Sequence, residues 1–233
     1  MKKIIVKNIY LFSLGLLLIT SCAKKNDDPQ PENTEPFSSV LTEREEVIQI
    51  PEAFANNNTN QYAVETRSYI GSTNAFFGFY RGFLAIPQNT NANGNGIWTW
   101  QGFDGSEITY TSTLTNGVYQ VTMKVKEANG EVYTIFEATE RQDGTSGKIT
   151  WFDPEESGVI ELVMDWKYEN GLFTSTIESD GQRIVSESND NLSGTIKVYE
   201  NNVLIFTANW QSTGAGECVS YNNDGTQNDA GSW

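Results

Sequence analysis

Hydrophobic and polar residues alternate along most of the chain between Gly96 and Tyr221. Residues 119–126 and 160–168, for example, each place apolar side chains on one face of an extended strand and polar side chains on the other. A period of two is typical of antiparallel strands that are buried on one face only. The pattern predicts roughly nine or ten consecutive strands.

Tight turn signals separate these runs. Asn-Gly or Asp-Gly pairs stand at 116–117, 129–130, 143–144, 170–171 and 180–181. Such pairs readily adopt the positive φ angles that short hairpin turns need. Nothing between the runs is long enough for a crossover helix, so the predicted topology is an up-and-down meander.

The segment from Asn60 to Leu84 has a different period. Its large apolar residues recur at spacings near three, four and seven, which favours an amphipathic helix, with a strand through residues 75–86 as the alternative. Gly71 and Gly78 would each cost about 1 kcal/mol inside a helix unless close packing offsets them. The predicted fold is therefore α+β and mostly β, with a helix packed on a large antiparallel sheet that forms a half-barrel or closes into a barrel.

A weak repeat occurs within the predicted sheet. Gly147, Gly194 and Gly216 are each followed by an apolar residue two positions later and an aromatic residue five positions later. The first two copies lead into strands that end in tryptophan. Cys218 occupies the position of an isoleucine in the other two copies, which predicts that it packs in the core.

The N-terminus has the features of a signal peptide. Three lysines precede an apolar run from Ile9 to Ile19, and Thr20 and Ser21 then precede Cys22. The sequence Ile19-Thr20-Ser21-Cys22 resembles the lipobox of bacterial lipoproteins. The alternative is an ordinary secretory signal in which the cysteine is incidental.

The resemblance implies that residues 1–21 are removed and that Cys22 is acylated and holds the protein to the outer membrane. Two or three acyl chains give a stable attachment. Residues 25–28, Lys-Asn-Asp-Asp, also resemble the signal that sends lipoproteins of the Bacteroidetes group to the cell surface, although Asn26 departs from its tightest form. Residues 22–38 are polar and proline-rich, which predicts a disordered acidic tether before a single β-rich domain at 39–233.

Charge and composition limit the function classes. The formal net charge is −15, so nucleic acid and anionic lipid surfaces would repel the body. The chain has no histidine and only two cysteines, which excludes serine triads and histidine-based zinc sites. We therefore expect no metal, no cofactor and no catalysis, because the acids clustered at 153–165 match what chance gives in so acidic a chain.

Two tryptophans are candidates for ligand binding. Trp98 and Trp100 lie two residues apart and would face the same way from one strand, beside Gly94 and Gly96. Exposed aromatic rings can stack on sugars or on aromatic side chains. The alternative is that both rings pack into the core.

Two functions fit these observations. The first is a lipid-anchored binding or accessory module at the cell surface, with a glycan or an envelope protein as its partner. The second is a periplasm-facing carrier that holds an apolar small molecule between helix and sheet. The acidic signal after Cys22 favours the first.

Overall fold

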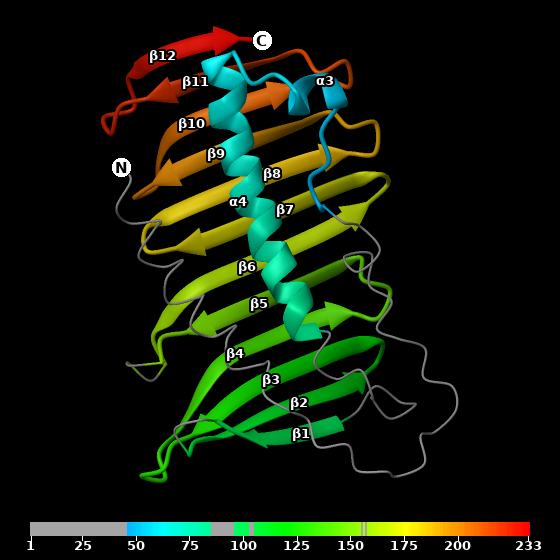
Figure 1. The fold of residues 1–233 in the computed structure, drawn as a ribbon, viewed down its shortest axis with the longest axis vertical. Helices are drawn as coiled ribbons and strands as arrows, with labels where there is room; N and C mark the ends of the chain where they lie inside the picture. The colour runs from blue at the N-terminus through cyan, green and yellow to red at the C-terminus, as the bar shows by residue number, and fades with distance from the viewer. Residues whose placement is uncertain (1–45, 85–95, 103–104, 155, 157) are drawn as a thin grey trace.

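The computed structural model describes residues 46–84, 96–102, 105–154, 156 and 158–233. Twelve strands form one antiparallel sheet in which the order of strands follows the order of the chain (Figure 1). The strands are β1 (Gly96–Gln101), β2 (Glu107–Thr115), β3 (Val118–Lys126), β4 (Val132–Arg141), β5 (Ser146–Phe152), β6 (Ile160–Glu169), β7 (Leu172–Ser179), β8 (Gln182–Asn189), β9 (Gly194–Glu200), β10 (Val203–Trp210), β11 (Gly216–Tyr221) and β12 (Gln227–Ser232). The meander predicted from the alternation is confirmed.

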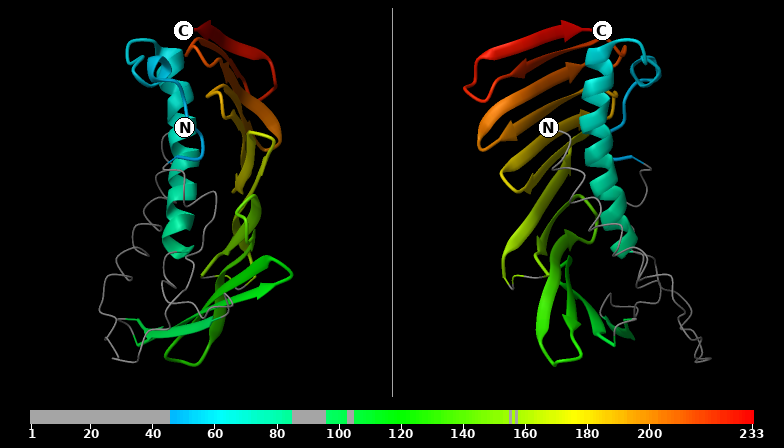
Figure 2. Two further views of the ribbon diagram at one scale, coloured as in Figure 1. Left: turned by 90° about the vertical axis from the view of Figure 1, so that its right-hand side faces the viewer. Right: turned by 60° about the vertical axis from the view of Figure 1, so that its left-hand side comes forward.

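The sheet is open. β1 and β12 stand at its two ends in the strand order, so the closed-barrel alternative is wrong. The short helix α3 (Glu52–Ala55) leads into the long helix α4 (Gln61–Leu84). α4 crosses one face of the sheet from β12 towards β4, and no described helix lies on the other face (Figures 1 and 2).

α4 begins at an asparagine cap that also ties the helix to the last strand. The Asn60 side-chain oxygen accepts hydrogen bonds from the backbone N–H groups of Tyr62 (3.0 Å) and Ala63 (3.2 Å), while its amide nitrogen donates to the carbonyl of Ser232 (2.9 Å). Capping of this kind satisfies N–H groups that lack partners within the helix. The first turn of α4 is thus fixed to β12.

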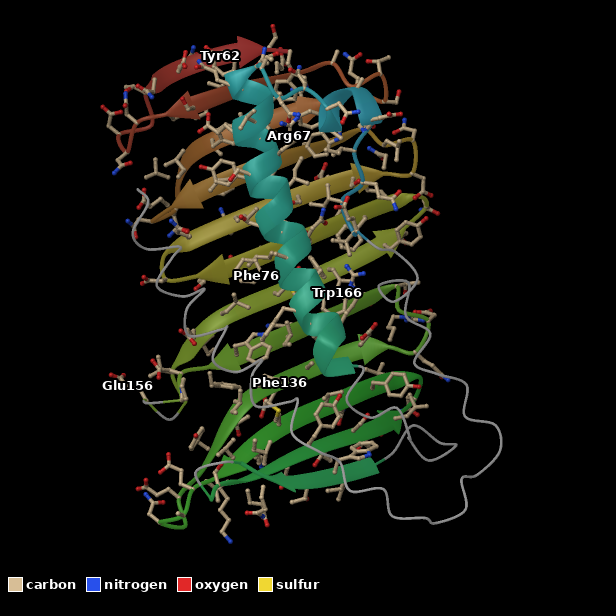
Figure 3. The ribbon with its side chains drawn as sticks, in the orientation of Figure 1. Tyr62, Arg67, Phe76, Phe136, Glu156 and Trp166 are labelled. Carbon is tan, nitrogen blue, oxygen red and sulfur yellow. The ribbon has the colours of Figure 1, made fainter. Side chains whose placement is uncertain are left out.

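Aromatic rings fill the space between α4 and the middle of the sheet. The Phe77 ring meets Trp166 edge-on at 5.8 Å between centroids and Phe173 at 5.5 Å, and Tyr80 lies 5.2 Å from Trp166. Phe77 and Tyr80 are essentially inaccessible to solvent. Figure 3 shows Phe76 on α4 and Trp166 on the sheet beneath the helix. This is the apolar face that the spacing in residues 60–84 favoured.

The weak sequence repeat has a structural cause. Gly147 pairs with Trp166 across β5 and β6, and Gly194 pairs with Trp210 across β9 and β10. In each pair the indole lies over the glycine, so that a Cβ atom there would come within 2.2 Å and 2.4 Å of the ring. Aromatic cover of a strand glycine is a known means of stabilising such positions.

The third copy of the repeat behaves in the same way. Gly216 exchanges backbone hydrogen bonds with Trp233, whose indole covers it. Trp233 also stacks on Phe54 of α3 at 4.8 Å, and Trp210 lies 5.9 Å from the same ring. Cys218 is buried in the core, as its alignment with the isoleucines predicted.

The chain enters the described domain along α4. Val47 and Ile48 are fully buried, and the Asn74 side chain pairs with Ile48 like a neighbouring strand. The Ile48 N–H donates to Asn74 Oδ1 at 2.9 Å, and Asn74 Nδ2 donates to the Ile48 carbonyl at 3.0 Å. The N-terminal segment thus joins the body on the side that the helix covers.

The number of strands exceeds the prediction. The structure has eleven strands between Gly96 and Tyr221, and β12 follows them. β12 escaped the prediction because its sequence, QNDAGS, has no apolar alternation and is exposed except near Gly231. A Cβ atom at Gly231 would clash with the Tyr62 ring, so this strand contacts α4 through a glycine.

The glycines provide a direct test of the packing. We expect Gly147→Ala to destabilise the fold by about 1–3 kcal/mol, because the added methyl group meets the Trp166 ring and the Thr139 carbonyl. Gly78→Ala is the matched control, since nothing lies within 4 Å of its Cβ position on the exposed side of α4. That change should stabilise the protein by about 0.5–1 kcal/mol through helix propensity. Urea denaturation followed by circular dichroism measures both, and equal effects at the two sites would contradict the packing.

Candidate functional site

The uncovered face of the sheet carries a row of side chains across four strands. Val163, Glu178, Arg183 and Tyr199 are successive register partners on β6, β7, β8 and β9. Their neighbours along each strand are the residues that face the core, so the row points away from α4. It lies close to the ends of these strands, where the β7–β8 and β9–β10 hairpins turn.

A groove of about 420 Å³ opens beside this row. Its lining comes from the start of β6 (Ile160, Glu161 and Val163), from residues 178–183 around the β7–β8 turn, and from Asn201 and Asn202 in the β9–β10 turn. Three hairpins that are separate in sequence therefore build one polar hollow. We refer to it below as the outer groove.

Two tight turns hold the rim of the outer groove. Asp180 and Gly181 have φ angles of 44° and 73°, and Asn201 and Asn202 have 49° and 66°, as the mirror-image hairpin turns require. The Asn201 N–H donates to the Gly181 carbonyl at 2.7 Å and joins the turns to each other. The shape of the rim is thus set by backbone geometry.

Arg183, which lines the groove, lies over the ring of Tyr199. Its guanidinium carbon is 4.2 Å from the centroid of the Tyr199 ring, a cation–π contact. In the described part of the chain Arg183 makes no ion pair or hydrogen bond, and its Nε is buried without an acceptor. Stacking, not an ion pair, positions this guanidinium.

The groove is acidic overall. Glu161, Glu178 and Asp180 face a single guanidinium among the lining residues. Partial burial raises the pKa of Glu161 above its usual value, and the nearby Asp153 carboxylate raises it further. Among the described residues no group of histidine, cysteine or acidic side chains could hold a metal ion.

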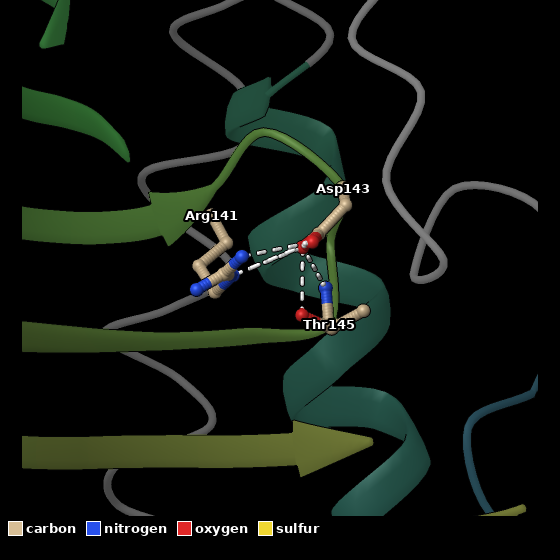
Figure 4. A network of polar contacts seen from close by, with 3 residues as sticks. All are labelled: Arg141, Asp143 and Thr145. Carbon is tan, nitrogen blue, oxygen red and sulfur yellow. Dashed lines mark hydrogen bonds and ion pairs between the residues drawn. The ribbon is translucent and has the colours of Figure 1, made fainter. Parts of the chain in front are cut away.

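At the opposite end of the strands, a carboxylate stabilises a hairpin turn and is not available to a ligand. In the β4–β5 turn, Asp143 accepts hydrogen bonds from the backbone and hydroxyl of Thr145 and from the Arg141 guanidinium (Figure 4). The Thr145 hydroxyl, followed by Arg141, lowers the pKa of Asp143 to about 2. This acid has its partners within the turn and is no ligand candidate.

A second polar group lies on the covered face. The Tyr80 hydroxyl donates to Glu140 Oε2 at 3.0 Å, and both side chains are buried. Burial raises the pKa of the Tyr80 hydroxyl well above its usual value, and the Glu140 carboxylate adds to the effect. The contact joins the C-terminal half of α4 to β4. It was not anticipated, although Glu140 follows Phe136 and Ala138 at the spacing of two that places residues on the core face.

Trp98, one of the predicted site residues, is not among the residues that line the outer groove. Trp98 is half-buried, and its ring meets Tyr110 edge-on at 5.6 Å and folds over Gly96. Gly96 thus makes room for Trp98 itself, which favours the core interpretation of that ring. The Trp100 side chain and Cys22 lie outside the described residues, and the ligand role of the tryptophans and the acylation of Cys22 stay predictions.

Sequence reasoning missed Arg183, Tyr199, Glu178 and Asp180. Of the acids noted near one hairpin, Glu161 does line the groove. The signal that could have found them was the two-residue turns at 180–181 and 201–202. The first of these turns fixes the register of β7 and β8 and places Glu178 opposite Arg183.

Comparison with models of protein families and with curated protein sequences gave no match. Within the described residues, no helix is long and apolar enough to cross a membrane. The function is therefore inferred from the geometry above and from the sequence of the N-terminus.

The raised pKa of Glu161 can be measured. We expect the pKa of its carboxyl group to lie above the usual value of a glutamate in the folded protein, and Asp153→Asn to move that pKa downward because it removes a nearby negative charge. The folded state then binds this proton more tightly than the unfolded chain does. Its contribution to stability is present below the unfolded pKa and is lost as pH rises through the folded value.

Carbon-13 NMR titration of the glutamate side chains reads this pKa directly. Asp143→Asn is the matched control, because it removes an acid from a turn at the other end of the strands. If both substitutions shifted Glu161 equally, the local repulsion by Asp153 would be wrong.

Proposed function

We propose that this protein is a lipid-anchored lipoprotein of the outer membrane that acts at the cell surface as a non-catalytic binding module. Its binding surface is the uncovered face of the sheet, and its ligand is a glycan or another envelope protein. The observation that carries the proposal is the outer groove, a preformed polar hollow on the face that α4 leaves free.

The path of the chain supports this arrangement. The segment from Glu46 to Ile50 joins the body beside α4, where Asn74 holds Ile48. An anchor at Cys22 would thus pull on the covered side, and the outer groove would point away from the attachment. A flexible tether of residues 22–38 would give the body a reach of roughly 20 Å from the lipid.

The packing of α4 favours this module over a carrier of apolar ligands. A carrier would need space beneath Phe76, Phe77 and Tyr80. In the described part of that interface, Phe77 and Tyr80 are buried against Trp166 and Phe173. At these residues, rings of the protein itself fill the space between helix and sheet.

The anchor has a direct test. Cys22→Ala should leave the body folded but move it from the membrane fraction to the soluble fraction, because the acylated residue is lost. Cys218→Ala is the matched control, since that thiol is buried in the core and should not affect attachment. Cell fractionation and immunoblotting measure both. A Cys22→Ala protein that stays with the membrane would contradict the anchor.

Surface exposure is tested separately by treating intact cells with trypsin. Cleavage at Lys24 or Lys25 should release the body into the medium. Lysed cells provide the control for susceptibility to the protease. If the protein were cut in lysates and untouched on intact cells, it would face the periplasm and the surface location would be wrong.

A further inference from the structure

The chemistry of the outer groove identifies the class of its ligand. We infer that the groove binds a neutral saccharide, with Arg183 donating to its oxygens and the groove carboxylates accepting from its hydroxyl groups. The inference rests on the proposed function, a binding module that uses this face, and narrows its ligand. Four properties of the groove support it.

The size and rigidity suit a small polar ligand. A volume of about 420 Å³ falls at the lower end of the range of roughly 300–1,000 Å³ that is usual for small-molecule sites. Both turns on the rim are two-residue hairpin turns joined by the 2.7 Å hydrogen bond from Asn201 to Gly181. A preformed rim reduces the loss of conformational freedom on binding.

The guanidinium of Arg183 requires acceptors. Arginine carries five N–H donors and no acceptor. The guanidinium carbon lies 4.2 Å from the centroid of the Tyr199 ring, and no described acid or carbonyl pairs with the guanidinium. A ligand in the groove must therefore offer oxygen atoms with free lone pairs, as a sugar hydroxyl or ring oxygen does.

The acids select against an anionic ligand. Glu161, Glu178 and Asp180 give the lining two more negative than positive charges, in a protein whose formal net charge is already −15. Like charges brought close together at a partly desolvated site disfavour binding. A lone arginine would attract a phosphate, a sulfated sugar or a sialic acid. The three carboxylates around Arg183 would repel such an anion, so we do not expect it to bind.

The acids would attract a cationic peptide, but its ammonium groups supply donors only and would leave the Arg183 guanidinium without an acceptor. The lining also includes two aliphatic side chains, Val163 and Ile160, and Ile160 is 57% exposed. A pyranose combines a hydrophobic C–H face with hydroxyl groups that both donate and accept. It is the ligand class that matches donors, acceptors and apolar surface together.

The experiment uses the full chain carrying Cys22→Ala, so that ligand chemistry is measured apart from membrane attachment. The protein is tested on an array of neutral, sialylated and sulfated glycans, and with a tetralysine peptide by isothermal titration calorimetry. We expect at least one neutral glycan to bind, and its sialylated or sulfated form to bind at least tenfold more weakly.

Two arginine variants then locate the site. Arg183→Ala should weaken binding of that neutral glycan by tenfold or more, whereas Arg141→Ala removes a guanidinium from the opposite hairpin end and should leave binding unchanged. Circular dichroism checks folding. If Arg183→Ala does not fold, Arg183→Lys keeps the charge but not the planar fork, and binding should still weaken.

Several results would overturn the inference. These are no binding by any neutral glycan, equal or stronger binding of the acidic forms, binding of tetralysine alone, or equal effects of the two arginine variants. None of them bears on the anchor or the surface location, which the fractionation and the trypsin treatment decide. Conversely, a periplasmic location with intact neutral-glycan binding would overturn the surface module and leave the ligand class standing.

Discussion

The contact between the rings of α4 and the rings of the sheet is the interaction on which the rest of this structure depends. A single sheet cannot bury a core alone and needs a second layer on at least one face. In the described residues α4 is the main part of that layer, and Phe77 and Tyr80 pack against Trp166 where α4 crosses the middle strands. Since the sheet is wider than one helix, the large aromatic side chains extend the cover that the helix provides.

Glycine allows the sheet to accept those rings. At Gly147 and Gly194 the backbone has no side chain of its own on the covered face, and the cross-strand indole takes that space. Large and small positions thus alternate between partner strands, which lets the rings lie close to the sheet beneath α3 and α4. The opposite face needs no such complementarity, and charged residues, amides and threonines dominate it. The division of the sheet into a packing face and a free face follows from one period-two pattern.

Most of this arrangement could be predicted from the sequence because it is local. Alternation gave the strands, and Asn116-Gly117, Asn170-Gly171 and Asp180-Gly181 occupy the two-residue turns expected of them. The turns at 129–130 and 143–144 are longer, and only their glycines have positive φ. The Asn201-Asn202 pair forms the same kind of two-residue turn without a glycine, and the sequence analysis did not recognise it.

The outer groove could not be predicted because it depends on register between hairpins. Its lining combines the start of β6 with two turns that lie on β7–β8 and β9–β10, and the connection from β8 to β9 is too long for its register to follow from turn type alone. Arg183 and Tyr199 have no relation in sequence and become neighbours only once that register is fixed. The closed-barrel alternative was wrong for a similar reason. Alternation identifies each strand but does not determine whether the first and last strands pair.

The way in which the chain enters the domain also determines how the fold would respond to force. Ile48 is fastened to the side of α4 by two hydrogen bonds from one asparagine, and Val47 beside it is buried. Tension applied from the N-terminal side would load these contacts along the helix axis, in shear, before it reached any edge strand. Shear breaks several contacts at once, whereas peeling a strand from an open edge breaks them one pair at a time. The edge strand β12 would be loaded only through α4, whose first turn is fixed to it.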